Sequence, residues 1–330
     1  MTGADDWFPV RVTAKVRDGD DVFLFDLADP AGAPLPSFQP GAHIDVAVER
    51  AVDGTGLTRQ YSLYSAPADT RRYGIAVQRE AEGRGGSRTL CDTVAAGDTV
   101  RIRRPRALFT LAAGATSHVM IAGGIGITPL LSMASHLAGD GSVTLHYLVR
   151  RRDRAALLDA ARQAVGPENL HLHVTAETGR PDLARLIGPP ARGRHLYLCG
   201  PAPLLDAATA AARGLGWPES HVHLERFAAD GAANAVANAG ANRPFLLRLR
   251  STGAVIPVMA DQTAAEALAG ANVELPISCA EGVCGACITG VLDGTPEHRD
   301  CVLTEAEHKA NRLFTPCCSR AVSEMLVVDL

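Results

Sequence analysis

One short stretch near the C-terminus, from Cys279 to Cys287, constrains the fold of this chain more than any other. It reads Cys-Ala-Glu-Gly-Val-Cys-Gly-Ala-Cys, with four residues between the first two cysteines and two between the next pair. This is the spacing of a plant-type [2Fe–2S] loop, which needs one more cysteine far downstream. Cys317, which Cys318 follows directly, supplies it. The pattern predicts a cluster held by four thiolates, in a loop whose glycines let the backbone fold tightly.

The alternative for this loop is a zinc site or a set of unpaired structural cysteines. Zinc sites commonly combine two short two-residue spacings, whereas this chain has a four-residue gap and a distant fourth cysteine. The N-terminus lacks the pattern of a signal peptide, so we expect a cytoplasmic protein whose eight cysteines indicate metal or redox use instead of disulfides. Outside the cluster, Cys91, Cys301 and Cys318 are expected to be small buried apolar residues. A net charge of −4 predicts binding neither to nucleic acid nor to a membrane surface.

Residues 1–112 have the pattern of short strands separated by glycine- and proline-containing turns. We expect strands at 10–16, 22–27, 43–48, 59–65, 73–79 and 100–103, and one helix at 87–94. Such a segment predicts a small antiparallel β-barrel.

Two stretches of this barrel indicate a flavin site. Arg59-Gln60-Tyr61-Ser62-Leu63 offers a cation for phosphate, an aromatic face and a hydroxyl for a ring edge. Gly85, Gly86 and Ser87 open the expected helix, where free backbone N–H groups bind anions. Either stretch alone occurs in ordinary strands and turns, and the flavin interpretation depends on finding both in one barrel.

Residues 113–227 change to alternating strands and helices, which predicts a parallel α/β sheet with ligands beyond the carboxyl ends of its strands. Gly123-Gly124-Ile125-Gly126-Ile127-Thr128-Pro129 and Cys199-Gly200 follow two of the expected strands. This is not the full Gly-x-Gly-x-x-Gly dinucleotide fingerprint, so a plain strand–helix turn is the alternative.

The C-terminal part begins after a linker at 228–244, which is rich in alanine, asparagine and glycine. Residues 245–330 then form the cluster domain, with strands at 245–250, 255–258, 288–292 and 325–328 and a helix at 263–269. We therefore expect a multidomain chain: a flavin-type antiparallel barrel, an α/β parallel sheet and an α+β plant-type ferredoxin domain of the β-grasp class.

In its whole length and module order the chain resembles the reductase components of two-component Rieske oxygenases, the family of phthalate dioxygenase reductase and vanillate O-demethylase reductase. The matching stretches are 59–63, 85–87, 104–111, 123–129, 199–201, 225–227, 279–287, 298–300 and 317–321. The resemblance implies FMN and NADH as cofactors besides the cluster, a Rieske-type aromatic oxygenase or O-demethylase component as electron acceptor, and a monomer.

The resemblance also implies site residues. FMN would be held by Arg59, Tyr61, Ser62, Gly85, Gly86 and Ser87. NADH would lie over Gly124, Gly126, Thr128 and Pro129, with Cys199 and Gly200 near the nicotinamide and Phe227 by the flavin. Ser62 and Cys199 are the residues expected to contact the reacting rings, and Cys317, in place of Cys318, is the expected fourth ligand.

The choice between NADH and NADPH depends on residues 150–153. Arg150, Arg151 and Arg152 would suit a 2′-phosphate, whereas Asp153 would suit the free ribose hydroxyls. The resemblance favours NADH, with Arg151 near the ribose. Two other functions share part of these motifs: an NAD(P)H reductase that serves a cytochrome P450 or another acceptor, and an electron carrier without nicotinamide chemistry.

Overall fold

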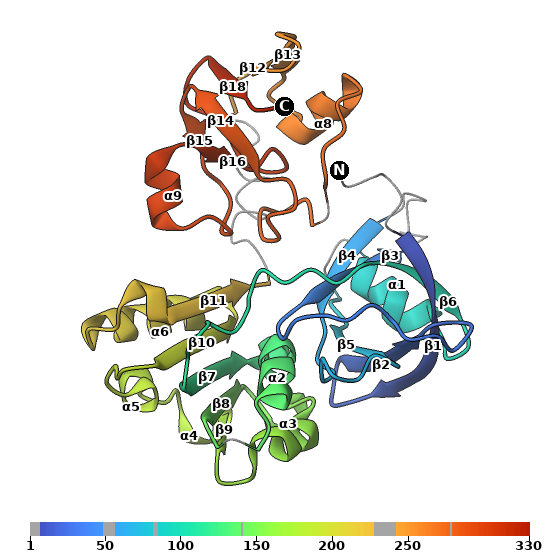
Figure 1. Cartoon of the computed structure of the whole chain (residues 1–330), viewed down its shortest axis with the longest axis vertical. Coiled ribbons are helices and arrows are strands. Elements are labelled where there is room, and N and C mark those ends of the chain that lie inside the picture. Colours follow the sequence, from blue (N-terminus) through green and yellow to red (C-terminus); the bar gives the residue numbers. More distant parts are fainter. Residues whose placement is uncertain (1–6, 49–56, 82–84, 140, 228–241, 278) are drawn as a thin grey trace. The chain divides into compact units, whose positions relative to one another are not determined.

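The computed structural model describes residues 7–48, 57–81, 85–139, 141–227, 242–277 and 279–330. They belong to two compact units, Met1–Glu225 and Arg226–Leu330 (Figure 1). Most of the linker predicted at 228–244 lies outside the described residues, and the domain boundaries inside the first unit stay predictions. None of the described helices is long and apolar enough to cross a membrane.

The N-terminal part of the first unit is a six-stranded antiparallel sheet that curls into a nearly closed barrel, as predicted. The strand order is β4-β3-β6-β1-β2-β5, and a bridge from Leu63 to Ile75 brings the edge strands together. Its elements are β1 (Trp7–Arg17), β2 (Val22–Ala28), β3 (His43–Val48), β4 (Leu57–Ser62), β5 (Tyr73–Gln78), β6 (Thr99–Arg103) and α1 (Gly86–Thr93). Alternating apolar residues such as Val10, Ile44 and Ile102 are fully buried inside, because successive strand side chains point to opposite faces.

A five-stranded sheet follows, in the order β11-β10-β7-β8-β9. Parallel pairings join β10, β7, β8 and β9, which confirms the predicted parallel sheet. Its strands are β7 (Ser117–Gly123), β8 (Val143–Val149), β9 (Leu170–Val174), β10 (Arg194–Gly200) and β11 (Val222–Arg226). Its helices are α2 (Ile127–His136), α3 (Leu158–Val165), α4 (Thr175–Thr178), α5 (Leu183–Ile187) and α6 (Ala202–Gly214).

Helices cover both faces of this sheet, with α2 and α3 on one side and α5 and α6 on the other (Figure 1). Met120 and Ala122 of β7 pack toward α2 and α3, while Val119 and Ile121 pack toward α5 and α6. Because both faces are covered, the central strands are continuous apolar runs. This arrangement leaves the carboxyl ends of β7 and β10 as the edge where polar ligands can approach.

The barrel and the sheet share part of one core. Val22, Ala76 and Phe109 of the barrel belong to the same buried cluster as the α2 side of the sheet. A hydrogen bond 3.0 Å long from the buried Ser132 hydroxyl to the Ser65 carbonyl also joins the two parts. The Asp18 carboxylate accepts a further bond of 2.7 Å from the Leu157 amide.

The pattern of residues 154–165 predicts a helix that starts at Arg154, but the helix starts later. Residues Arg152–Arg154 form a short 3₁₀ turn, and Leu157 takes a left-handed conformation with φ of 60° before α3 begins at Leu158. Leu157 tolerates this conformation while its side chain is buried and its amide is bonded to Asp18. A tertiary contact with the barrel has therefore overridden the local helical pattern.

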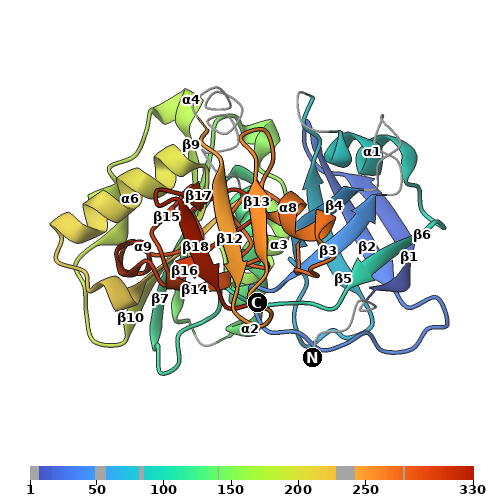
Figure 2. The same cartoon turned by 90° about the horizontal axis from the view of Figure 1, so that it is seen from above.

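The second unit is a mixed sheet in the order β13-β12-β18-β14-β16, with the small pair β15-β17 beside it (Figure 2). Its elements are β12 (Phe245–Leu249), β13 (Val255–Val258), α8 (Ala264–Gly270), β14 (Thr289–Asp293), β15 (Pro296–Glu297), α9 (Glu305–Ala310), β16 (Leu313–Phe314), β17 (Arg320–Ala321) and β18 (Met325–Val328). β12 and β18 run parallel, whereas β13 is antiparallel to β12. The helix α9 was not predicted.

Candidate functional site

The predicted flavin residues of the barrel come together at the N-terminus of α1. Arg59 lies on β4, and its side chain covers Gly86, since a Cβ at that glycine would lie 2.6 Å from Arg59 Nε. Gly85 caps the helix with φ of 88°, a left-handed conformation that glycine adopts without strain. An arginine against a glycine-opened helix N-terminus is the donor set that binds a phosphate group.

The other residues of this group flank the same helix and strand. Ser87 accepts a 3.1 Å hydrogen bond from the Glu80 amide, which fixes the start of the helix. Ser62 is buried at the end of β4, opposite His43 of β3. Burial raises the pKa of the Tyr61 phenol, so this ring stays neutral and presents an apolar face. The arrangement fits a flavin, while the individual contacts remain predictions.

Arg88 is a cation that the sequence analysis missed. Its Nη2 lies 3.8 Å from where a Cβ of Gly85 would sit, and its Nε is buried without a hydrogen-bond partner among the described residues. A buried guanidinium nitrogen without a partner needs an acceptor. The phosphate of a flavin at the α1 N-terminus would provide one. The only sequence signal for this role is that an arginine follows Ser87 directly. Its side chain reaches the glycine turn because the chain is helical here.

The two glycine turns of the sheet lie against each other. A Cβ at Gly126 would lie 2.3 Å from the Cys199 carbonyl oxygen, and one at Gly200 would lie 2.9 Å from the Cα of Gly123. Thr128 donates a 3.0 Å hydrogen bond to the Ile125 carbonyl, which closes the turn, and Pro129 is buried in the first turn of α2. Of the predicted nicotinamide residues, Gly124 is partly exposed with open space at its Cβ position, whereas the others are buried at the ends of β7 and β10.

Two titratable groups, Cys199 and Glu225, lie near the ends of the neighbouring strands β10 and β11. Burial raises the pKa of the Cys199 thiol, so the thiol stays protonated and packs as an apolar side chain in the core between the sheet and α2 and α3. Burial also raises the pKa of Glu225 to about 8, and its Oε2 has no hydrogen-bond partner among the described residues. A negative charge on Glu225 would raise the pKa of Cys199 further. Glu225 lies in the matching stretch 225–227, and no sequence signal gives it a role.

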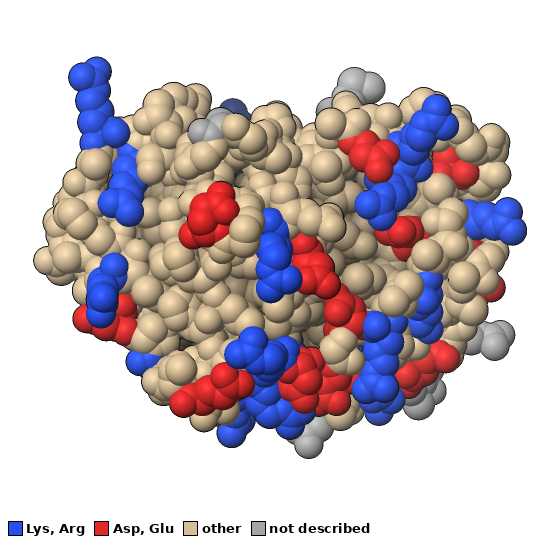
Figure 3. Space-filling model, turned by 90° about the horizontal axis from the view of Figure 1, so that it is seen from below, with Lys and Arg blue, Asp and Glu red and all other residues tan. Residues whose placement is uncertain are grey.

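Arg151 is already paired with acidic groups. It forms two hydrogen bonds with Asp153, of 3.0 and 2.6 Å, and one of 3.2 Å with Asp20 of the barrel. Arg152 pairs with Glu177 at 3.2 Å. Figure 3 shows positive and negative side chains interleaved on the face that it views. Any phosphate at Arg151 would compete with these carboxylates.

The cysteine loop of the second unit places its thiols in two pairs. Cys287 Sγ lies 3.2 Å from Cys317 Sγ, and Cys279 and Cys284 interact with each other. Backbone amides of Glu281 and Ala286 point at the sulfurs of Cys279 and Cys284, at 3.3 and 3.4 Å. Two irons with two thiolates each are what a [2Fe–2S] cluster requires, and the N–H groups stabilise negative charge on its sulfurs.

The neighbouring cysteines also have contacts outside these pairs, although Cys318 interacts with Cys317 as well. Cys318 Sγ lies 3.5 Å from the Thr315 hydroxyl, and Cys301 Sγ lies 3.8 Å from the Gly282 carbonyl. Gly282 has φ of 75°, and a Cβ there would lie 2.5 Å from Cys318 Sγ, so the loop needs glycine at this position. These contacts favour Cys317 as the fourth ligand. Phe227 falls in the second unit and is partly exposed, and its predicted place by the flavin stays a prediction.

Three family models match successive parts of the chain. An oxidoreductase FAD-binding domain matches residues 9–111, and a model described as a dimethylamine monooxygenase subunit DmmA-like N-terminal domain matches residues 99–222. A 2Fe-2S iron-sulfur cluster binding domain matches residues 247–322. The order of flavin, middle and cluster modules therefore agrees with the sequence interpretation.

A relative named vanillate O-demethylase oxidoreductase, from Pseudomonas sp. (strain HR199 / DSM 7063), is 40% identical over 97% of this chain and 99% of its own length. The chain belongs to this family of flavin- and [2Fe–2S]-containing oxygenase reductases. It is accordingly an oxidoreductase with a flavin-binding and a cluster-binding domain.

Two solved structures share the whole module order of this family. The structure of a phthalate dioxygenase reductase has a TM-score of 0.73 at 36% identity and covers 99% of this chain and 98% of that one. A type IV self-sufficient cytochrome P450 monooxygenase has a TM-score of 0.81 at 37% identity, covering 98% of this chain but 41% of that one. In that second protein the same modules are part of a longer chain.

Proposed function

We propose that this protein is an NADH-dependent reductase that binds FMN and supplies single electrons to a Rieske-type aromatic oxygenase or O-demethylase. The observation that carries the proposal is the two-pair cysteine loop in a chain that also has the Arg59–Gly86 anion site. A bound flavin supplies the two-electron acceptance and one-electron release that a nicotinamide and a one-electron cluster need between them.

The role of the protein's own residues is to bind and orient. Arg59, Arg88 and the α1 N-terminus bind the flavin phosphate, and Ser62 offers a hydroxyl to the ring edge. Gly124, whose Cβ position is open, admits the nicotinamide close to the backbone, and Gly126 lets this turn pack on the Cys199 carbonyl. The two thiol pairs, 279 with 284 and 287 with 317, hold the irons.

The preference for NADH is supported by the ion pairs of Arg151. Asp153 and Asp20 already neutralise this guanidinium, so a 2′-phosphate would have to displace them. We expect kcat/KM with an artificial acceptor to be higher for NADH than for NADPH, and equal values or a preference for NADPH would contradict the proposal. Arg151→Ala should leave this ratio nearly unchanged, whereas a selective loss of NADPH activity would show that Arg151 binds the phosphate.

FMN, in place of FAD, is proposed on the family resemblance and is decided by the mass of the flavin released on heating. The electron path is tested by anaerobic titration of the holoprotein with NADH. Cys284→Ser should remove the cluster absorption, keep flavin reduction by NADH and stop electron delivery to an oxygenase. Retained delivery in this variant would overturn the proposal.

The acceptor itself has one alternative with a specific observation behind it. The solved P450 monooxygenase carries modules of the same fold within a single chain. A parallel assay of this reductase with a purified Rieske oxygenase and with a purified P450 distinguishes the two. Faster turnover of the P450 would refute the Rieske assignment while leaving the internal chemistry intact.

A further inference from the structure

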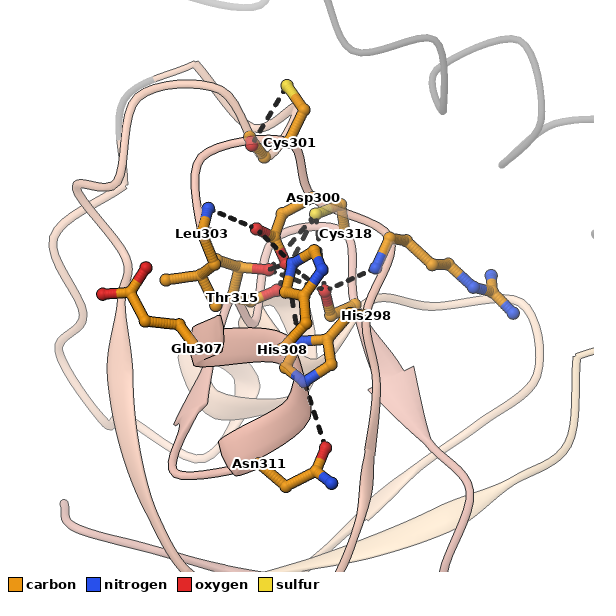
Figure 4. Close-up of polar contacts among 12 residues, drawn as sticks. His298, Asp300, Cys301, Leu303, Glu307, His308, Asn311, Thr315 and Cys318 are labelled. Atoms are coloured by element: carbon orange, nitrogen blue, oxygen red, sulfur yellow. Dashed lines mark hydrogen bonds and ion pairs between the residues drawn. The ribbon is translucent and has the colours of Figure 1, made fainter. Parts of the chain in front are cut away.

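Two histidines and an aspartate converge behind the cysteine loop. His298, Asp300 and His308 each offer one ligand atom, and these three atoms all lie within 4.8 Å of one another. His308 Nε2 is 3.2 Å from Asp300 Oδ2, and His298 Nδ1 is 3.7 Å from Asp300 Oδ1. Figure 4 shows the two imidazole rings lying against each other beside the carboxylate, and their centroids are 4.3 Å apart.

The hydrogen bonds of His298 leave one of its nitrogens unsatisfied. Its Nε2 is 3.2 Å from Oδ1 of Asn311, an atom that can only accept, so Nε2 carries the hydrogen. In the neutral ring Nδ1 then holds a lone pair. That atom is buried and has no hydrogen-bond partner among the described residues, and the atom nearest to it in this cluster belongs to a carboxylate, another acceptor. A Lewis acid between them would relieve this conflict.

Hydrogen bonds fix the orientation of the Asp300 carboxylate, as is usual for carboxylates that bind metal ions. Its side chain is fully buried, its Oδ2 accepts a 2.9 Å bond from the Leu303 amide, and its Oδ1 accepts 3.2 Å and 3.4 Å bonds from the hydroxyls of Thr315 and Ser319. Ligating carboxylates are usually fixed by such outer hydrogen bonds. One added proton on His298 would make an ion pair with Asp300, whereas a divalent cation would be bound by all three side chains at once.

The other histidine groups of the chain differ in this respect. His146 Nδ1 bonds to His173 Nε2 at 3.2 Å, and His195 Nδ1 bonds to His223 Nε2 at 3.0 Å. In each pair one ring donates and the other accepts, and burial lowers the pKa of His146 and of His223 to about 4, which keeps them neutral. These pairs satisfy each other without a cation.

We propose that His298, Asp300 and His308 form a binding site for a transition-type divalent cation, Zn²⁺ being the best match. Two imidazoles and one carboxylate suit Zn²⁺ and exclude Mg²⁺ or Ca²⁺, which prefer all-oxygen sites. Tetrahedral Zn²⁺ with bonds of about 2.0–2.1 Å places its donor atoms roughly 3.3 Å apart. Imidazole lone pairs lie in the plane of the ring, so the His308 ring would leave its stack with His298 to direct its lone pair at the ion. The side chain of His308 is 30% exposed, which gives an entry path and leaves the fourth position to water.

A cation at this site would stabilise the position of the cysteine loop, because the 298–300 segment packs against the backbone of Gly282. The Cys301 amide donates a 3.0 Å hydrogen bond to the Gly282 carbonyl, and a Cβ at Gly282 would lie 2.9 Å from the Asp300 Cα. A cation that joins His308 of α9 to the 298–300 segment therefore ties that helix to the backbone behind Gly282. Its role is structural, and it is separate from the iron ligands.

The test uses untagged holoprotein dialysed against micromolar Zn²⁺, with zinc and iron per chain measured by elemental analysis. We expect one zinc per chain in the wild type, lost in His298→Gln and in His308→Gln, with the iron content unchanged. The matched control His173→Gln removes a histidine of another group and should keep the zinc. Unchanged zinc in both site variants, or loss of zinc in the control alone, would overturn the proposal.

Asn311 offers a variant that removes no ligand. It ends α9 with φ of 53°, a left-handed conformation that both glycine and aspartate tolerate. Asn311→Gly should weaken Zn²⁺ binding about 10–100-fold because His298 loses its orienting acceptor, whereas Asn311→Asp should keep it.

X-ray absorption at the zinc edge distinguishes this site from the cysteine loop. Nitrogen and oxygen neighbours at about 2.0–2.1 Å are expected, whereas sulfur at about 2.3 Å would mean that zinc replaces iron and would refute the site. If the wild type takes up no zinc, the three residues form an ion-pair cluster only.

Discussion

Replacing Gly126 by alanine should open the turn at the proposed nicotinamide site and destabilise the first unit. The backbone φ of Gly126 is −63°, so alanine is not strained by conformation. Its Cβ would instead lie 2.3 Å from the Cys199 carbonyl oxygen and 2.5 Å from the carbonyl carbon. This is more than 1 Å short of ordinary contact between heavy atoms. Backbone atoms cannot move aside by changing rotamer, so the two turns must separate.

The magnitude follows from the kind of atoms involved. Overpacking in a core costs about 1–3 kcal/mol, and a clash with backbone belongs at the upper end of that range. For a unit of this size about 3 kcal/mol lowers Tm by about 6–12 °C. A separation of about 1 Å at a site that orients a hydride donor can reduce its reaction about 100-fold.

The assay combines thermal unfolding with the rate of flavin reduction by NADH in stopped flow. Gly114→Ala is the matched control, because Gly114 has φ of 78° and open space around its Cβ position. The control should lose about 1–2 kcal/mol from backbone strain and keep its rate of flavin reduction. If Gly126→Ala keeps both the wild-type Tm and the wild-type rate, the back-to-back packing of the turns does not form the proposed nicotinamide site.

Three further outcomes are expected. Cys317→Ser should lose the cluster absorption while Cys318→Ser keeps it, and the reverse result in visible spectra would reassign the fourth ligand. Arg59→Ala should weaken flavin binding about 10–150-fold, since a lost hydrogen bond to a charged group costs about 1.5–3 kcal/mol; equal retention on ultrafiltration would contradict the anion site. Between the ordinary value of 4.5 and about 8, folded Glu225 keeps a proton that the unfolded chain releases, so the free energy of unfolding falls as pH rises through this window. Glu225→Gln should flatten that fall in urea unfolding series, and an unchanged slope would show that Glu225 is not the group involved.

Local patterns in the sequence predicted most of the fold. The strands of the barrel alternate apolar and polar residues, and glycine or proline marks their ends, so their bounds were found to within a few residues. The helix α9 was missed, although the sequence has a recognisable N-terminal capping motif at its start. Thr304 and Glu307 form a capping box, with a 3.2 Å bond from the Glu307 amide to the Thr304 hydroxyl.

Features that depend on contacts between distant segments could not be predicted. The start of α3 is set by Asp18, which lies in another part of the first unit. The closeness of Arg59 to Gly86 depends on how β4 meets α1 across the barrel. The isolation of His298 Nδ1 likewise follows from the position of Asn311 at the end of α9. The residues of each pair lie many positions apart in the sequence, so local hydrophobic periodicity cannot predict that they are in contact.

The core shared by the barrel and the α/β sheet has a consequence for protein engineering. Val22, Ala76 and Phe109 pack with residues of the sheet, so a chain cut after residue 112 would expose apolar surface on both fragments. A cut between Glu225 and Arg226 separates two units that each enclose a core of their own. Chimeras that exchange the cluster-bearing end between related reductases should therefore be joined at this boundary, and the first two modules should be transplanted together.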